Sequence, residues 1–249
     1  MAKKIYEITR NFLKSGLNAL GFDLIRTNKL ARFNLCGLKH LNINTVIDVG
    51  ANQGQFARAM QAHFPQASFI CYEPLSEPFA VLQSWANESQ RKVRACNLAL
   101  GNRDGEAQMF FHRAFSPSSS LLPNTKLGES LFPATKSQEC TTVKLATLDH
   151  ALQGLELIEN ILIKLDVQGY EDRVLEGGQK IFGKAAACIL EISLDDLYEG
   201  QADFRGLFAQ FDRMNYRYAG NLDQVHAADG HIIYLDAVFV RRGAGLGYE

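Results

Sequence analysis

The sequence lacks any hydrophobic run long enough to cross a membrane. A transmembrane helix needs about 20 consecutive, mostly apolar residues, and no segment of this 249-residue chain has that character. Residues 1–14 (MAKKIYEITRNFLK) contain lysines but no apolar stretch behind them, so we expect no secretion signal. Apolar residues make up 47% of the chain and charged residues 21%. This balance is typical of globular proteins and excludes a disordered or collagen-like chain.

Cysteine is scarce, and its spacing indicates no bridging role. The five cysteines are an odd number, and no two of them have CxxC spacing. Disulfide frameworks belong mostly to small secreted domains with an even set, so we expect free thiols and a cytoplasmic location. No Cys/His pair has the spacing of zinc ligands, and we therefore predict no metal site.

The chain also lacks an excess of positive charge, because its net charge is −1. This balance argues against a nucleic-acid partner. The charge is nevertheless divided unevenly: residues 1–40 hold eight basic and two acidic side chains, a sum of +6, so the other 18 basic and 25 acidic side chains sum to −7. Apolar residues in 1–20 recur at helical spacing. We predict an N-terminal helical extension over 1–40 and a single domain over 41–249.

The basic extension has several possible roles. A solvated cap helix, a cover over the active site, contact with an anionic acceptor, and peripheral docking on a membrane surface or a partner are the alternatives.

Apolar strands alternate with helical segments through the rest of the chain. Strand patterns cover 45–50, 67–73, 92–100, 107–112, 141–148, 160–167, 186–194 and 231–240, and helical patterns cover 54–63, 76–89, 171–182 and 204–216. This alternation predicts an α/β fold with a mostly parallel sheet covered by helices on both faces. Strands 217–220 and 231–240 have no helix between them, so we expect an antiparallel hairpin at one edge. Segment 113–140 lacks periodicity, as binding loops and plain surface insertions both do.

The strongest functional signal is the turn after the first strand. Residues 48–54 (DVGANQG) follow an apolar strand and open a helix, where glycines allow a tight turn and free backbone N–H groups face a ligand. Glu73 ends the next strand, 23 residues after Gly50. An acid at that place accepts hydrogen bonds from the ribose hydroxyls of a nucleoside.

The details of this turn favour a positively charged nucleoside. Asp48 would oppose the pyrophosphate of a dinucleotide, and Asn52 stands where a dinucleotide motif needs its middle glycine. S-adenosylmethionine carries an ammonium and a sulfonium that suit a carboxylate, together with a ribose for Glu73. The alternative role for Asp48 is to cap the turn.

Five segments together are similar to one family. DVGANQG, YEP, NLALG, the SSSL loop and IKLDVQGYEDRVLEGG resemble the FkbM-type S-adenosylmethionine-dependent methyltransferases, over about Thr45 to Ser193. The resemblance implies a class I methyltransferase (Rossmann-like) fold and O-methylation of a hydroxyl on a small molecule, sugar, polyketide or glycolipid-like acceptor. Family members commonly carry Glu where this chain has Gln168, and this departure weakens the case for a metal-dependent mechanism.

The resemblance also implies roles for single residues. Asp166, at the end of strand 160–167, lies where the acceptor meets the sulfonium. The expected cofactor-binding residues are Asp48, Gly50, Ala51, Asn52 and Gly54 at the methionine end, Glu73 and Pro74 at the ribose, Asn97 and Ala99 near the adenine, and Asp166.

Methyl transfer to a hydroxyl needs alignment and removal of one proton. Asp166 is the first candidate base and His112 the second. Lys164 faces the same side of its strand as Asp166 and is either a catalytic partner or a structural ion pair. Glu171 is catalytic, caps the next helix or orients Lys164. Glu191 is charged within an apolar strand, so it contacts the acceptor or anchors the site. In such folds loops and added segments build the acceptor pocket, and we expect these segments to be 113–140, the N-terminal 40 residues and 195–203.

Further candidates have weaker signals. His226 and His231 flank the last turn, and Arg58 and Arg113 suit an anionic acceptor or a solvated surface. The alternatives to an O-methyltransferase are a non-catalytic nucleoside-binding protein, a nucleic-acid methyltransferase and an NAD-linked enzyme.

Overall fold

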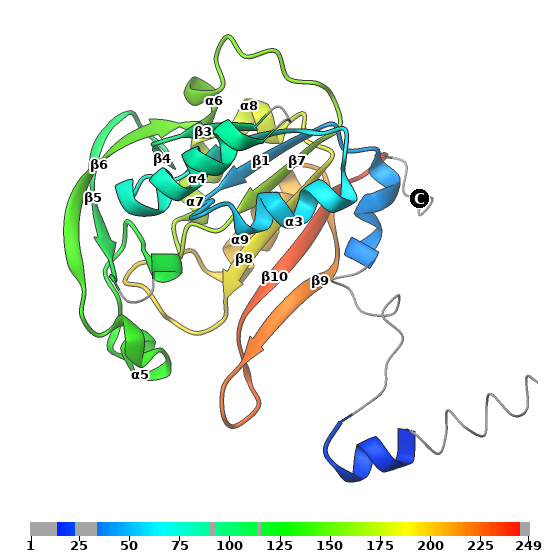
Figure 1. Cartoon of the computed structure of the whole chain (residues 1–249), viewed down its shortest axis with the longest axis vertical. Helices are drawn as coiled ribbons and strands as arrows, with labels where there is room; N and C mark the ends of the chain where they lie inside the picture. Colours follow the sequence, from blue (N-terminus) through cyan, green and yellow to red (C-terminus); the bar gives the residue numbers. More distant parts are fainter. Residues whose placement is uncertain (1–13, 23–33, 90–92, 114–115, 245–249) are drawn as a thin grey trace, which may run out of the picture.

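A computed structural model describes residues 14–22, 34–89, 93–113 and 116–244 of the chain. Its centre is a seven-stranded sheet (Figure 1). In spatial order the strands are β3 (Val93–Cys96), β2 (Ser68–Tyr72), β1 (Thr45–Val49), β7 (Ile161–Leu165), β8 (Ala187–Ser193), β10 (Ile232–Arg241) and β9 (Tyr216–His226). The five strands from β3 to β8 run parallel, and β10 pairs antiparallel with both β8 and β9. The predicted α/β class and the antiparallel edge hairpin are confirmed.

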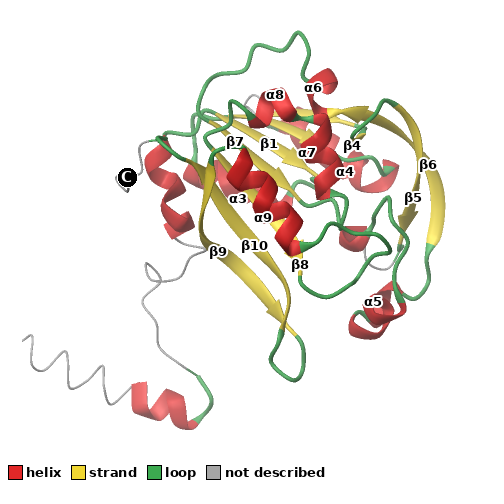
Figure 2. Ribbon diagram, turned by 180° about the vertical axis from the view of Figure 1, so that it is seen from behind, coloured by secondary structure: helices red, strands yellow, loops and turns green. Residues whose placement is uncertain are grey.

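Helices cover both faces of this sheet (Figures 1 and 2). One face carries α3 (Gln55–His63), α4 (Ser76–Glu88) and the 3₁₀ helix η2 (Leu35–Leu41), and the other carries α7 (Glu171–Gly177), α8 (Gln179–Phe182) and α9 (Phe204–Arg213). Because strand side chains alternate between the two faces, β1 contributes Val46 to one apolar core and Ile47 to the other.

A second, three-stranded sheet lies beside the first. Its order is β4 (Ala99–Gly101), β6 (Glu139–Thr147) and β5 (Gly105–Phe111). The single strand expected over 92–100 is therefore wrong, because the chain leaves the main sheet after Cys96. The physical reason is Asn97, whose amide donates to the carbonyl oxygens of Glu73 and Pro74, at 2.9 Å each, and so turns the chain toward β4.

Two other segments differ from the sequence expectations. The helix expected over 171–182 is two helices, α7 and α8, separated at Gly178. The irregular segment 113–140 contains η3 (Ser116–Ser118), α5 (Lys126–Leu131) and η4 (Pro133–Thr135), whose short helices are too brief to show periodicity in the sequence. The helix α6 (Leu148–Ala151) follows β6.

The predicted extension is described only in part. Residues 14–19 are helical. The predictions for residues 1–13 and 23–33 concern segments outside the described residues. Within 34–40, Leu35 and Leu38 are buried in the same core as Val46 and Phe69. This part of the predicted extension therefore packs on the main sheet. None of the described helices is long and apolar enough to cross a membrane.

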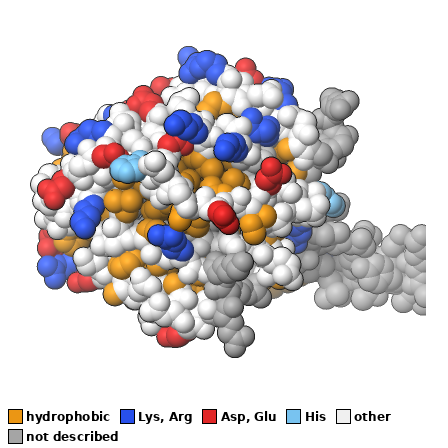
Figure 3. Space-filling view, turned by 90° about the horizontal axis from the view of Figure 1, so that it is seen from above, with side chains coloured by type: hydrophobic (Ala, Val, Ile, Leu, Met, Phe, Trp, Pro, Cys, Tyr) orange, Lys and Arg blue, Asp and Glu red, His pale blue; other side chains and the backbone are white. Residues whose placement is uncertain are grey.

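The amino end of the parallel strands carries an apolar hollow. Figure 3 looks onto this end of the molecule and shows apolar side chains gathered among charged ones. The hollow is lined by Leu152, Leu155, Leu157, Ile161 and Ile181, with Asp149, Glu159, Asn160, Lys180 and Lys184 around them. The clefts described next lie at the opposite, carboxyl end of the strands.

Candidate active site

The turn after β1 brings the chain close to the end of β7. Gly50 has a φ of +82°, and a Cβ built on it would lie 1.9 Å from the carbonyl oxygen of Asp166. Only glycine tolerates both the backbone conformation and this approach. The amides of Gly50 and Ala51 donate to the carbonyl oxygen of Tyr72, at 3.0 and 2.9 Å, so β1, β2 and β7 meet at this point.

A cleft opens above this turn. It encloses about 510 Å³, including its open mouth. The predicted cofactor residues that line it are Gly50, Asn52, Glu73, Pro74, Ala99 and Asp166. The loop after β5 contributes Ser116, Pro117 and Ser119, and we call this space the cofactor cleft.

Glu73 is buried at the base of the cofactor cleft. Its carboxylate accepts hydrogen bonds from the backbone amides of Asn52, at 2.9 Å, and Leu75, at 2.8 Å. Burial raises the pKa of Glu73 to about 7 although these two amides act in the opposite direction. The carboxyl therefore links the turn after β1 to the turn after β2.

Asp48 lies beneath the cleft, within β1. Its side chain is fully buried, and among the described residues neither carboxylate oxygen has a hydrogen-bond partner. Burial raises the pKa of Asp48 to about 6, and Lys164, its neighbour in the β1–β7 register, counteracts part of that rise. A buried carboxyl is energetically costly unless a cation lies nearby, and Lys164 is such a cation. The Asp48 side chain does not itself line the cleft.

Besides Asp48, three of the predicted cofactor residues support the cleft without lining it. Ala51 packs in the apolar core beneath the turn. Gly54 has a φ of +86° and begins α3. Asn97 holds the turn after β2 through the two carbonyl oxygens named above.

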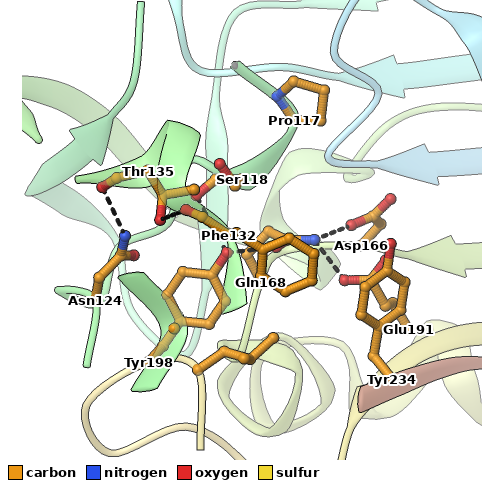
Figure 4. Close-up of a pocket in the computed structure, with 12 residues that line it drawn as sticks. Pro117, Ser118, Asn124, Phe132, Thr135, Asp166, Gln168, Glu191, Tyr198 and Tyr234 are labelled. Carbon is orange, nitrogen blue, oxygen red and sulfur yellow. Dashed lines mark hydrogen bonds between the residues drawn. The ribbon is translucent and has the colours of Figure 1, made fainter. Parts of the chain in front are cut away.

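A second cleft adjoins the first. It encloses about 580 Å³, including its mouth, and shares Pro117 and Asp166 with the cofactor cleft. Its other lining residues are Ser118, Asn124, Gly128, Phe132, Thr135, Gln168, Glu191, Leu197, Tyr198 and Tyr234 (Figure 4). We call it the acceptor cleft. Asp166 is the charged side chain common to the two clefts.

The Asp166 carboxylate is held from two sides. The Lys164 ammonium donates to its Oδ2 at 2.6 Å, and the Gln168 amide donates to its Oδ1 at 2.7 Å. Lys164 also lies 5.2 Å from the centre of the Phe56 ring of α3, and it is 8% exposed. The expectation that Lys164 and Asp166 face the same side of β7 is correct.

Gln168 connects Asp166 to β8 and to the loop after it. Its amide nitrogen also donates to Glu191 Oε1 at 2.5 Å, and its amide oxygen accepts from the Tyr198 hydroxyl at 2.5 Å. Burial, with Asp166 and Asp236 as nearby negative charges, raises the pKa of Glu191 well above its ordinary value.

Glu171 and His112 lie away from both clefts. Glu171 is 2% exposed and accepts from the amides of Val167 and Gly169, at 3.2 Å each, so it holds the turn between β7 and α7. Burial raises its pKa to about 7. His112 is buried, and its ring nitrogens contact the Ser137 carbonyl oxygen at 3.1 Å and the Asn124 amide at 3.2 Å. Both ring nitrogens are occupied by structural contacts, so the geometry does not support His112 as the base.

The weaker candidates are surface residues. His231 contacts Asp195 and Asp229, and His226 contacts the Gly230 carbonyl, all near the tip of the β9–β10 hairpin. Arg113 pairs with Glu139 at 2.6 Å, with both side chains largely exposed. Arg58 lies over the Trp85 ring at 4.6 Å.

Sequence reasoning located most of the acceptor cleft by segment but not its geometry. The expected segments 113–140 and 195–203 contribute Phe132 and Tyr198 among others. The described part of residues 1–40, also expected there, contributes no lining residue. Tyr234 and the contacts of Gln168 escaped prediction, because no local motif marks them.

The cofactor cleft fits S-adenosylmethionine. Gly50 has no side chain to obstruct the cleft where the turn approaches Asp166. The Glu73 carboxyl lines the cleft at the end of the neighbouring strand, where ribose hydroxyls are expected. No cluster of three or more His, Cys, Asp or Glu side chains suited to a metal ion occurs among the described residues.

Comparison with known proteins identifies relatives of this chain. The family model of the methyltransferase FkbM domain matches residues 48–218. 2-O-methyltransferase NoeI of Sinorhizobium fredii is 29% identical over 174 residues, which cover 65% of this chain and 68% of the relative. Methyltransferase 1 of Beauveria bassiana is 24% identical over 144 residues, which cover 53% of this chain and 57% of the relative.

A solved structure supports the fold. Methyltransferase FkbM from Methylobacillus flagellatus KT aligns with a TM-score of 0.50 at 12% identity, over 80% of this chain and 44% of that one. The chain thus spans less than half the length of that protein. The mostly parallel sheet with its antiparallel edge is that of a class I methyltransferase, as expected.

Proposed function

The chain belongs to the FkbM methyltransferase family, and from this premise we propose that it is an S-adenosylmethionine-dependent O-methyltransferase with a neutral, hydroxyl-bearing acceptor. One observation carries the proposal: two clefts meet at Asp166, at the carboxyl end of β7. In open α/β sheets, ligands bind at this end of the strands.

Different residues in and beneath the cofactor cleft suit different parts of S-adenosylmethionine. Glu73 suits the ribose hydroxyls, and Ala99 lies where the adenine is expected. The Asp48 carboxyl is buried beneath the turn and acts on the positive groups at the methionine end through its charge, without lining the cleft. When bound, S-adenosylmethionine supplies an activated methyl group, so the protein needs mainly to align the acceptor oxygen.

Asp166 is the base in this proposal. Its carboxylate faces both clefts, and Lys164 and Gln168 hold its orientation through the two hydrogen bonds already described. Each carboxylate oxygen has a second lone pair, so Asp166 can still accept the proton of a hydroxyl. General base catalysis of this kind contributes roughly 10²–10⁴-fold.

The charge of the acceptor cleft favours a neutral acceptor. Among the described residues that line it, Asp166 and Glu191 are acids, and no Lys, Arg or His side chain is present to pair with an anion. An anionic acceptor would be repelled there. Phe132, Tyr198 and Tyr234 add aromatic faces to the same cleft, which suits a ring with apolar C–H groups and polar hydroxyls. The name of the rhizobial relative describes a 2-O-methyltransferase, in line with an oxygen acceptor.

The cysteines support the expected compartment. All five are free, as expected of a protein kept in a reducing environment. A cytoplasmic location and a peripheral contact through residues 1–40 remain proposals.

The Asp166→Asn variant tests the proposal. The amide cannot accept a proton, so we expect turnover of a responsive acceptor from a panel of neutral glycosides and phenols to fall at least about 100-fold. Binding of S-adenosylhomocysteine, measured by calorimetry, should remain within a few-fold of wild type. Wild-type turnover in D166N would remove Asp166 from the mechanism. A wild-type protein that binds NAD and not S-adenosylhomocysteine would overturn the proposed function.

A further inference from the structure

We propose that Gln168 is a positioning residue of the acceptor cleft: its side-chain amide holds the carboxyl groups of Asp166 and Glu191 together, facing the cleft, so that Asp166 accepts the hydrogen bond of the reacting hydroxyl. This inference rests on the proposed function and deepens it, because it identifies what recognises the hydroxyl. We call Gln168 with its three side-chain partners, Asp166, Glu191 and Tyr198, the amide clamp.

Both polar atoms of the Gln168 side chain have hydrogen-bond partners within the amide clamp. The Gln168 amide nitrogen donates to Asp166 and to Glu191, which uses both of its hydrogens. Its oxygen accepts from Tyr198 (Figure 4). The partners come from β7, β8 and the loop after β8, so one side chain joins three elements at the cleft.

The direction of the amide is determined by its neighbours. In the opposite orientation, the amide oxygen would face two carboxyl oxygens at 2.5–2.7 Å, and the contacts would be repulsive. The Tyr198 hydroxyl reinforces the observed orientation, since it donates to the amide oxygen and also lies 3.2 Å from the Ser118 carbonyl oxygen.

The backbone of Gln168 is also fixed. Its φ is +56°, in the left-handed region that few non-glycine residues adopt. The Ser120 hydroxyl donates to its carbonyl oxygen at 2.7 Å. Stabilised strain of this kind is typical of functional sites, and here it aims the side chain between two acids.

The clamp explains how two acids share one cleft. Two neighbouring carboxyl groups repel each other unless a proton, a cation or a donor lies between them. Lys164 reaches the far oxygen of Asp166, so the donor between Asp166 and Glu191 is the Gln168 amide. A glutamate at 168 would place a third acid against the other two.

The same region holds other titratable groups that the test must consider. They are Lys164 on β7, Glu171 at the start of α7, Tyr198 after β8, and Tyr234 and Asp236 on β10. None of them changes in the variants below, so their contribution is common to all the proteins compared.

The experiment compares the thermal unfolding midpoint of four full-length proteins: wild type, Gln168→Glu, Gln153→Glu and the double variant Q168E/E191Q. Gln153 is exposed in the turn after α6, so Q153E adds the same charge outside the clefts. The double variant exchanges the amide and the carboxyl across one contact. Measurements are made at about pH 5.5 and about pH 8, on either side of the titration expected for a buried acid.

We expect Q168E to match Q153E more closely at low pH and to fall about 5 °C or more below it at high pH. The new acid is protonated in the folded state at low pH, so it donates in place of the amide, and that stability is lost as the pH rises. The double variant should recover at least half of the high-pH loss. Q168E behaving like Q153E at both pH values, or a double variant no better than Q168E, would overturn the amide clamp.

Binding of S-adenosylhomocysteine separates this inference from the proposed function. Gln168 does not line the cofactor cleft, so Q168E should bind it within a few-fold of wild type. Loss of binding in wild type would contradict the proposed function and leave the unfolding data to decide the clamp. If the affinity for S-adenosylhomocysteine fell tenfold or more in Q168E and not in the other proteins, Gln168 would also act on the cofactor cleft, and its assignment to the acceptor cleft would be wrong.

Discussion

Single residues at the end of β1 carry most of the geometry of the cofactor cleft. Gly50 permits the approach of the Asp166 carbonyl, and Asp48 is buried two residues before it. These two requirements act within three consecutive residues, which is why a short sequence motif indicates them so well.

Gly50→Ala should destabilise the protein by at least about 3 kcal/mol, because the methyl group meets backbone that cannot move aside. Gly154→Ala is the matched control, since Gly154 has a φ of +77° and open space around it. The control should lose only about 1–2 kcal/mol from the left-handed conformation. Urea unfolding of both variants measures the loss in free energy of unfolding. Equal losses in the two variants would mean that the backbone moves to relieve the contact between the added Cβ and the Asp166 carbonyl oxygen.

The elements around the clefts are less local in origin. The loop that begins with η3 lies over the cofactor cleft and is tied to the turn after β1, because the Asn52 amide donates to the Ser116 hydroxyl at 3.0 Å. The same loop separates the two clefts through Pro117.

Ser116→Ala removes that tie between the loop and the turn. A hydrogen bond of this kind contributes about 1 kcal/mol, so the affinity for S-adenosylhomocysteine should fall roughly fivefold, as measured by calorimetry. Ser84→Ala on the exposed side of α4 is the control and should bind as wild type. Unchanged affinity in S116A would show that the loop closes without this contact.

The whole molecule concentrates acids at the carboxyl end of its sheet. Asp48, Glu73, Glu171 and Asp236 have pKa values raised to about 6 or 7, chiefly by burial. The folded state therefore retains protons that the unfolded chain releases above about pH 4. Their contribution to stability is present below that pH and is lost as the pH rises through about 7.

The free energy of unfolding should consequently be lower at about pH 8 than at about pH 5. Glu171→Gln should reduce this fall, because the amide oxygen can still accept the two backbone hydrogen bonds but no longer titrates. Glu176→Gln, on the exposed side of the same helix, should leave the fall unchanged. Urea unfolding at the two pH values measures the fall in the free energy of unfolding. An equal fall in E171Q and in wild type would contradict the burial of a titrating acid at position 171.

The sequence by itself determined the α/β class, the edge hairpin, the family and the turn at Gly50. These depend on strand and helix periodicity and on motifs within a few consecutive residues, where local sterics decide the conformation. The break of 92–100 at Asn97 escaped prediction, because the hydrogen bonds that cause it join residues 23 and 24 positions apart. The interruption of the helix at Gly178 also escaped prediction.

The acceptor cleft was decided only by the tertiary structure. The sequence motif does not show the partners of Gln168. The parallel pairing of β7 and β8 brings Asp166 and Glu191 to its amide, and the loop after β8 brings the Tyr198 hydroxyl. Likewise, His112 was a reasonable base by residue type, and folding enclosed it between Ser137 and Asn124. The site depends on side-chain contacts between segments, which composition and periodicity do not encode.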